Sequence, residues 1–325
     1  MQRGVLISLL ALTVLASLAL ALAWGSSGFA PAAVWRSLTA AGDPVLHDIV
    51  LQLRLPRALA ALGVGACLAV AGALMQVLLR NPLADPYVLG TSGGAAVAAL
   101  LALLAGAGAV AVNAAAFAGA LFSTLLVFSI GLAARDQSPG RLLLTGVVIA
   151  AGWGAVLTLI LALAPDRNLR GMLFWLMGDF SFATRIAPPL LTAGLATAAG
   201  MAFAPALNIL AGGDQQAALL GLAVRPARAV LYFFSALLTA VAVTTAGTVG
   251  FVGLVVPHLV RLLGGADHRT VIPGAALAGG ALLVLADTLA RTVLAPRQLP
   301  VGALMALVGV PLFLALLRRA GATGR

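Results

Sequence analysis

Long stretches without a charged side chain constrain this sequence more than any other feature. Residues 58–79 and residues 86–134 contain no charged residue at all. Of the 325 residues, 62% are hydrophobic and 9% are charged, whereas a soluble domain carries about 25% charged residues. A helix needs about 20 consecutive apolar residues to cross a bilayer. The chain is therefore predicted to be an all-α integral membrane protein.

Ten apolar runs are expected to cross the membrane within one transmembrane domain that covers residues 1–325. The runs are 4–24, 57–79, 87–106, 109–133, 142–164, 187–208, 227–247, 249–264, 270–291 and 301–318. Glycines interrupt the apolar sequence at 106–108 and 247–250, so we expect one span to end and the next to begin at each place. The first run exceeds the apolar core of about 7–15 residues in a cleavable signal peptide. It is interpreted as an uncleaved span.

An even number of spans places both termini on the same side of the membrane. The last residues include Arg318, Arg319 and Arg325, and the positive-inside rule assigns such an end to the cytoplasm. Eight arginines then fall on the outer side: Arg36, Arg54, Arg57, Arg167, Arg170, Arg185, Arg291 and Arg297. Contacts with lipid phosphates explain some of them, and a docking surface for an acidic soluble partner would explain the others.

The connector Leu79–Gly94 is unusual because it joins two apolar runs yet is rich in helix-breaking and polar residues. It contains Pro82 and Pro86, which disfavour helix, together with an Arg, an Asn and an Asp. Non-helical backbone between spans must be covered by protein or line a water-filled space. The connector is therefore either a solvated turn or the rim of a pathway. Its glycines would let the following helix pack closely against its neighbours.

The segment Ala206–Pro226 differs from the other loops. Two glycines break the preceding span, and Asp214–Leu222 is predicted to form a short amphipathic helix, with Asp214 as its N-cap and Gly221 near its end. Such a helix either rests on lipid or docks into a groove on another protein. It lacks the basic face of a lipid-bound helix, which favours the protein partner.

A second glycine-rich stretch covers residues 247–261. Gly247, Gly250 and Gly253 recur every three residues, and Pro257 removes a helical hydrogen bond. Broken helices of this kind often mark transport pathways. His258 follows this proline and is expected to cap the break, to gate, or to satisfy a freed carbonyl.

Several functional classes are excluded by composition. The chain contains no lysine, so it cannot form a Walker-type ATP-binding loop. Cys67 is the only cysteine, and His47, His258 and His268 lie far apart, so neither a disulfide nor a metal or cofactor site is expected. The arginines stand mostly singly at the ends of apolar runs, which argues against nucleic-acid binding. The chain is not expected to be an enzyme.

Proton-coupled transport is the alternative function that the residues leave open. It requires an acid at membrane depth, and Asp287 is the strongest candidate. Arg291 lies four residues later, so a simple ion pair on one helical face is the competing interpretation.

Taken together, the motifs resemble the FecCD-type permeases of type II ABC importers, which carry iron–siderophore complexes, haem and vitamin B12. The resemblance extends from about Leu51 to Arg319. It is carried by Leu53–Arg57, Arg80–Pro86, Leu89-Gly90 with Ser92–Ala95, Gly250–His258 and Leu299–Gly302. It implies a vitamin B12 permease-like fold with ten helices in a bacterial inner membrane. The implied partners are a second copy of the chain, two ATPase subunits that bind ATP and Mg, and a periplasmic substrate-binding protein.

The resemblance also implies roles for individual residues. Asn81 and Leu83 match a cytoplasmic gate. A second gate position matches Pro139 and Gly140, where this sequence departs from the small hydroxyl residues of the family member compared. Arginines that receive acids of the binding protein match Arg54, Arg57 and Arg291. Contact with the ATPase matches the segment Asp214, Gln215, Gln216, Ala217, Leu220 and Gly221.

The remaining candidate residues are expected along the pathway or at close helix contacts. They are Gly90, Ser92, Gly93, Gly94, Gly250, Gly253, Pro257 and His258. Among the possible cargoes, Tyr87–Gly90 and Phe174–Ser181 resemble vitamin B12 permeases slightly more than haem permeases. The sequence does not otherwise distinguish one chelate from another.

Overall fold

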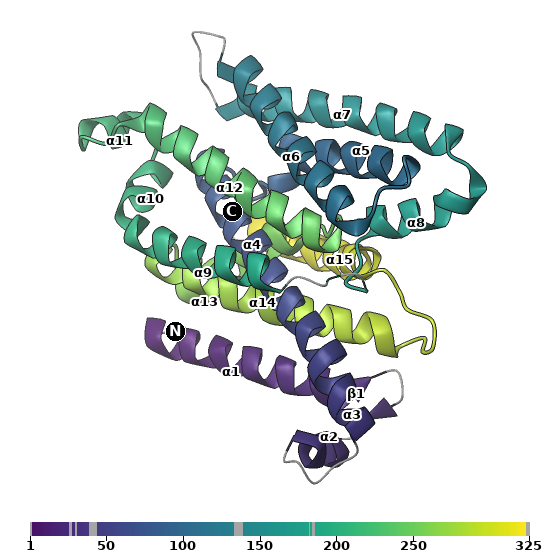
Figure 1. The fold of residues 1–325 in the computed structure, drawn as a ribbon. Helices are drawn as coiled ribbons and strands as arrows, with labels where there is room; N and C mark the ends of the chain where they lie inside the picture. The colour runs from purple at the N-terminus through teal and green to yellow at the C-terminus, as the bar shows by residue number, and fades with distance from the viewer. Residues whose placement is uncertain are drawn as a thin grey trace.

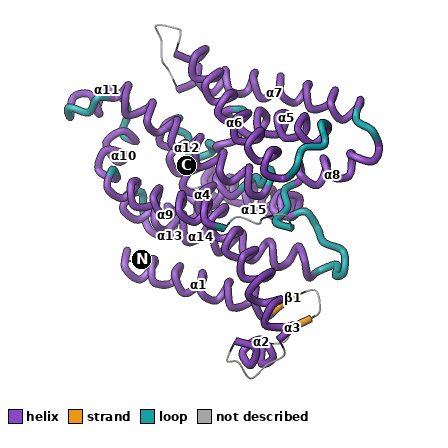
Figure 2. Tube along the Cα trace, viewed as in Figure 1, coloured by secondary structure: helices purple, strands orange, loops and turns teal. Residues whose placement is uncertain are grey.

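The protein is an almost entirely helical bundle in the computed structural model, which describes residues 2–25, 28–29, 31–38, 44–132, 139–181, 183 and 186–322 (Figure 1). Within these residues the only strands are β1 (Trp24–Gly25) and β2 (Gly28–Phe29). They form an antiparallel pair after the first helix, and the rest of the described chain is helix joined by loops and turns (Figure 2). The all-helical prediction is confirmed.

The helices follow one another in this order: α1 (Arg3–Ala23), α2 (Pro31–Leu38), α3 (Pro44–Asp48), the π-helical η1 (Ile49–Arg54), α4 (Leu55–Leu78), the 3-10 turn η2 (Pro86–Leu89), α5 (Thr91–Leu104), α6 (Ala109–Leu132), α7 (Pro139–Leu163), α8 (Asp166–Met177), α9 (Ala187–Ala202), α10 (Ala204–Ala211), α11 (Asp214–Leu219), α12 (Val224–Ala246), α13 (Val252–Gly264), α14 (His268–Thr292) and α15 (Val301–Ala322).

Each of the ten predicted runs coincides with an apolar helix or a bent pair of helices. Among the described residues, six helices are long and apolar enough to cross a membrane. α9 and α10 together form a seventh candidate, bent by 67°, and α5, α13 and α15 contain shorter apolar helices. The expected breaks are confirmed, because α5 ends at Leu104 before α6 begins at Ala109, and α12 ends at Ala246 before α13 begins at Val252. Ten membrane crossings remain a prediction.

Helix α4 forms the centre of the bundle and is buried along most of its length. A side chain at Gly65 would overlap the backbone of Gly279 in α14, and one at Gly72 would overlap the backbone of Gly253 in α13. Small residues therefore set how closely α13 and α14 approach α4, as is common where helices pack in lipid. By contrast, α7 is mostly exposed.

The bundle has two ends that carry different chemistry. One end, which we call the α8 end, includes α8, residues 178–181 and the loop at residues 293–300. The other, the α11 end, includes α11, the N-terminus of the chain and the start of the connector after α4. Figure 1 shows α8 on one side of the bundle and α11 with the N-terminus on the other.

Candidate functional site

The connector between α4 and α5 is ordered by its own polar side chains. The backbone N–H of Leu83 donates to Asn81 Oδ1 over 2.9 Å, and the N–H of Tyr87 donates to Asp85 Oδ1 over 2.8 Å. Each acceptor lies two residues before its donor, which is the pattern of an Asx turn. The prediction of a non-helical connector rested on its prolines and did not anticipate these two turns. The side chain of Leu83 is 39% exposed at the surface of the connector.

The glycines at the end of the connector lie at close helix contacts. Gly90 adopts a left-handed conformation with φ of 75°, which a glycine tolerates without strain. A side chain at Gly93 would collide with Trp153 of α7, and one at Gly94 would collide with the backbone of Gly119 in α6. These contacts fix α5 between α6 and α7.

The second predicted gate lies at the start of α7. Pro139 and Gly140 are its first two residues. The side chain of Pro139 lies outside the described part of the chain, and a side chain at Gly140 would meet no atom within 4 Å. Gating by these residues, and by Asn81 and Leu83, remains a prediction.

Helix α11 is shorter than expected and is capped differently. It covers Asp214–Leu219, and Gly213 is the N-cap. Asp214 does not cap the helix but pairs with Arg228 of α12, with 2.9 Å between Oδ2 and Nη2. The N-cap prediction is wrong because the carboxylate turns toward this cation on the next helix.

The α11 helix and the residue after it expose two leucines beside two glutamines. The side chains of Leu219 and Leu220 are 88% and 62% exposed, while Ala217 is buried against the bundle. The predicted coupling residues Gln215 and Gln216 are also exposed. Gly221 follows with φ of 81° and turns the chain toward α12. Exposed leucines on a short polar helix are typical of a protein contact.

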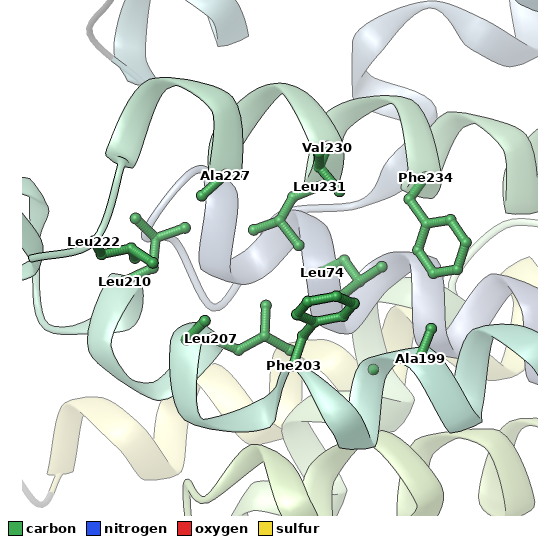
Figure 3. Close-up of a pocket in the computed structure, with 12 residues that line it drawn as sticks. Leu74, Ala199, Phe203, Leu207, Leu210, Leu222, Ala227, Val230, Leu231 and Phe234 are labelled. Carbon is green, nitrogen blue, oxygen red and sulfur yellow. The ribbon is translucent and has the colours of Figure 1, made fainter.

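An apolar cavity of about 330 Å³ lies beside α11, between α9–α10, α12 and α4 (Figure 3). Every side chain that the structure describes in its lining is apolar. The lining consists of Leu74, Ala199, Gly200, Phe203, Ala206, Leu207, Leu210, Leu222, Ala227, Val230, Leu231 and Phe234. The bend between α9 and α10 shapes this space, and Phe203-Ala204-Pro205 is the sequence signal for the bend. The cavity itself was not predicted.

Polar contacts tie α10 to the start of α14 near this end. The amide of Asn208 donates to Asp267 Oδ1 over 2.8 Å, and the N–H of His268 donates to Asn208 Oδ1 over 2.9 Å. Asp267 also accepts from the N–H of Arg269 and so caps α14. The donated hydrogen bond from Asn208, followed by that from Arg269, holds the pKa of the Asp267 carboxyl below its usual value.

At the α8 end, Arg57 is the centre of a polar network that includes the buried Asp287 and the exposed Gln298. Its Nη2 lies 2.8 Å from Asp287 Oδ1 and its Nε lies 2.9 Å from Asp287 Oδ2. Its Nη1 donates to Gln298 Oε1 over 3.1 Å, and Asp179 Oδ1 is 3.5 Å from Nη2. The predicted partner of Asp287, Arg291, is more distant, with 3.5 Å between Nε and Oδ2. The bidentate contact identifies Arg57 as the main partner of Asp287.

The other two arginines predicted to receive a partner protein also bind their own chain. Arg54 Nη1 donates to the carbonyl of Leu22 over 2.6 Å, and Arg291 Nη2 donates to the carbonyl of Ala21 over 2.9 Å. Arg54 and Arg291 are each only 7% exposed. The continuous helix over Pro44–Leu78 places Arg54 beside the end of α1. Both side chains are therefore largely buried against the end of α1, and their docking role remains a prediction.

Exposed arginines surround a hollow of about 1100 Å³ at the same end. Arg167 and Arg170 of α8 and Arg297 of the loop between α14 and α15 line it, and all three are exposed. The Arg170 guanidinium lies 5.9 Å from the ring centre of Phe174, which also lines the hollow. Arg185, another predicted outer arginine, lies outside the described residues.

Two of the three glycines in the stretch after α12 lie at close contacts with other helices, and the third does not. A side chain at Gly247 would collide with the α8 backbone, and Gly253 packs on α4, but a side chain at Gly250 would meet no atom within 4 Å. Pro257 is buried within α13, which continues through it. His258, which is half-buried, therefore lies inside the helix and not at its break. Ser92, another candidate position, is also half-buried in the first turn of α5.

Comparison with known proteins gives a family match over nearly the whole chain. Residues 10–319 match the FecCD transport family. The hemin transport system permease HmuU of Yersinia pestis is 42% identical over 290 residues, covering 86% of each chain. The vitamin B12 import system permease BtuC of Escherichia coli O127:H6 is 42% identical over 276 residues, covering 84% of each chain. An uncharacterized ABC transporter permease, YvrB of Bacillus subtilis, is 40% identical over 295 residues, covering 87% of this chain and 82% of its own.

Solved structures share the fold. A structure described as an inward-facing conformation of a metal-chelate type ABC transporter aligns with a TM-score of 0.87 at 29% identity, covering 96% of this chain and 98% of that one. The PsaBC complex of Streptococcus pneumoniae aligns with a TM-score of 0.58 at 16% identity, covering 83% of this chain and 93% of that one.

Proposed function

The chain belongs to the FecCD transport family, and from this premise we propose that it is the permease subunit of an importer that moves a metal chelate across the bacterial inner membrane. Its relatives include ABC permeases for hemin and for vitamin B12, each 42% identical to it. The observation that carries the proposal is the length of the family match, from residue 10 to residue 319. It spans both ends of the bundle and every long helix.

A separate ATPase supplies the energy in this proposal. The chain contains no lysine, so it lacks the phosphate-binding loop that such an ATPase needs. Helix α11 is the proposed contact, because its last residue, Leu219, and the next residue, Leu220, have most of their surface exposed. The α11 end is then cytoplasmic, which also places the predicted gate at Asn81 and Leu83 on the cytoplasmic side.

A second copy of the chain completes the pathway. Helix α7 leaves most of its apolar surface uncovered, and α15 also exposes large hydrophobic side chains. These are Leu307, Val308, Val310 and Leu314 on α15 and Leu144, Val147, Val148 and Leu159 on α7. Two copies that meet on these faces would enclose a channel bordered by small and apolar residues. Access would alternate between its two sides.

The cargo is proposed as a class: iron–siderophore, haem or cobalamin. The matched identities to a hemin permease and a vitamin B12 permease do not separate these candidates. The slight preference for cobalamin rests on Tyr87–Gly90 and Phe174–Ser181 alone. Selection among chelates is assigned mainly to a binding protein on the α8 side.

Reconstitution tests the proposal. The chain is placed in liposomes with the ATPase and binding protein encoded beside it, and uptake of cobalamin, haemin and a ferric siderophore is measured with and without ATP. We expect ATP-dependent uptake of one chelate, and none with an ATPase whose Walker lysine is replaced. Uptake that needs no ATP and follows a proton gradient would instead support the alternative, a secondary transporter that uses Asp287.

A further inference from the structure

We propose that the apolar cavity beside α11 holds an acyl chain of an anionic phospholipid, and that Arg80 and Arg228 bind the phosphate of this lipid. The inference rests on the proposed function only for the choice of leaflet, because that function places the α11 end on the cytoplasmic side. In this assignment the lipid is a structural ligand of the bundle and is neither cargo nor energy source.

The lining of the cavity favours an occupant without polar groups. Every side chain that the structure describes around its volume of about 330 Å³ is apolar. A peptide segment would bring backbone N–H and C=O groups that find no hydrogen-bond partner among these side chains, which is costly. An acyl chain carries no such groups. The volume lies near the lower limit of small-molecule sites, about 300–1,000 Å³, and suits part of one chain.

The cavity opens toward the membrane. Phe203, at the bend between α9 and α10, and Val230 of α12 line it from opposite walls, with Leu74 of α4 between them (Figure 3). Phe203 and Val230 are 65% and 63% exposed, whereas Leu74 is 1% exposed. Both walls belong to apolar helices that qualify as membrane spans. A lipid beside these helices can therefore insert one chain from the side.

Two cations lie near the end of the cavity at α11. Arg228 directly follows Ala227 of the lining, and its Nη2 lies 2.9 Å from Asp214 Oδ2. Arg80 is exposed, and a side chain at Gly213, next to Asp214, would lie 3.5 Å from Arg80 Nη1. Two of these three charged side chains are positive. Guanidinium groups match the geometry of a phosphate, so this end of the cavity suits an anionic headgroup.

Three further features of this end point to a headgroup. Arg80 has a φ of 48°, which is uncommon for a residue with a side chain and is often found where a ligand is held. Asp214 Oδ1 is buried and has no hydrogen-bond partner among the described residues, and a headgroup hydroxyl, as in phosphatidylglycerol, would supply a donor. Helix α12 begins at Val224, so the positive end of its dipole also lies here.

Lipid titration of the purified full-length chain tests the site. Dioleoyl phosphatidylglycerol is added to the protein in detergent, and native mass spectrometry gives the number of bound lipids and the Kd of the tightest one. Dioleoyl phosphatidylcholine, which has the same acyl chains and no net charge, is the matched lipid. We expect one phosphatidylglycerol per chain to bind at least about 10-fold more tightly than phosphatidylcholine, as for hydrogen bonds to charged groups.

Two substitutions separate the acyl chain from the headgroup. A227F fills the cavity, and R80Q removes one cation while the pair between Asp214 and Arg228 stays in place. We expect A227F to weaken the binding of both lipids. R80Q should weaken phosphatidylglycerol by about 10-fold and leave phosphatidylcholine unchanged. If A227F does not yield folded protein, A227V serves, with a smaller loss in the same direction.

Matched controls place the same changes outside the cavity. A218F adds the same ring on the exposed surface of α11, and R269Q removes an exposed cation at the start of α14. Both variants should keep the Kd of phosphatidylglycerol within about twofold. In liposomes, phosphatidylglycerol with a diazirine in its acyl chain should cross-link to the lining residues of α10 and α12, and A227F should abolish these cross-links.

The outcomes separate this inference from the proposed function. Equal Kd values for the two lipids, or unaltered phosphatidylglycerol binding by A227F, would overturn the lipid site. Release of the lipid when the ATPase binds, with cross-links between the cavity and a segment of the ATPase, would assign the cavity to a protein and also overturn it. None of these measurements uses ATP or cargo. A failure of ATP-driven uptake would therefore overturn the proposed function and leave the lipid site in place.

Discussion

The two ends of this bundle are held together in different ways. At the α8 end, Arg57 joins α4 to α14 through Asp287 and reaches Gln298 before α15. At the α11 end, a short helix with exposed leucines stands beside a cavity lined by apolar side chains. Directional bonds to buried charges resist movement, whereas apolar contacts are non-directional and can be rearranged at lower cost. The comparison points to a firm α8 end and an adjustable α11 end.

The largest expected effect follows from removing Arg57. The substitution R57M leaves the Asp287 carboxylate buried without its main partner, and breaking a buried pair in this way costs about 3–5 kcal/mol. We expect a clear fall in the thermal unfolding temperature of the purified protein in detergent. The double variant R57M/D287L should recover most of it. A single variant that unfolds like the unaltered protein would show that the network does not hold the α8 end.

A second large effect is expected at the exposed leucines of the α11 segment. L219D/L220D should leave the fold intact, because both side chains project from the bundle, but reduce co-purification of the ATPase by about 10-fold or more, as for central interface residues. Q215A is the control on the same helix and should retain the complex. An ATPase that remains bound to L219D/L220D and still responds to substrate would remove α11 from the coupling account.

Filling the apolar cavity should have a moderate effect on activity and a small one on stability. A227F adds a ring beside Leu222 and Leu231, where the structure has open space. If α10 and α12 move relative to each other, we expect ATP-driven uptake to fall several-fold, with at most about 1–3 kcal/mol of strain from overpacking. A193F, which places the same ring in the buried core, is the contrasting variant and should destabilise the protein strongly. Uptake by A227F at the normal rate would argue against an adjustable α11 end.

The smallest expected effect concerns the cap of α14. D267A removes the acceptor for the amide of Asn208 and the N–H of Arg269, and loss of such a cap costs about 1 kcal/mol. The pKa of Asp267 is lowered in the folded protein. Its contribution to the free energy of unfolding is therefore fully present above the ordinary carboxyl pKa of about 3.9. That contribution is lost as the pH falls through the lowered pKa of the folded state. Unfolding curves of D267A and the unaltered protein should therefore converge in acid. A constant difference at all pH values would assign the effect to packing.

The sequence was sufficient to predict where the helices lie but not which side chains pair between them. Uncharged runs and glycine breaks located every apolar helix, because both are local consequences of membrane burial and backbone freedom. The contact between Arg57 and Asp287 joins residues separated by 230 positions, and no local pattern encodes it. Arg291 was chosen as the partner because it lies one helical turn away. The cavity beside α11 was missed for a similar reason, since it depends on how α9–α10 bends against α12.

Paired spin labels at exposed positions can measure directly how far the helices move at each of the two ends. One pair, at Phe203 and Val230, spans the cavity at the α11 end, and the other, at Leu53 and Val293, spans helices joined by the Arg57 network. Cys67 is buried and should not react with the label. With the ATPase and ATP present, we predict that the distance across the α11 end changes while that across the α8 end stays constant. A change confined to the α8 end would contradict the account.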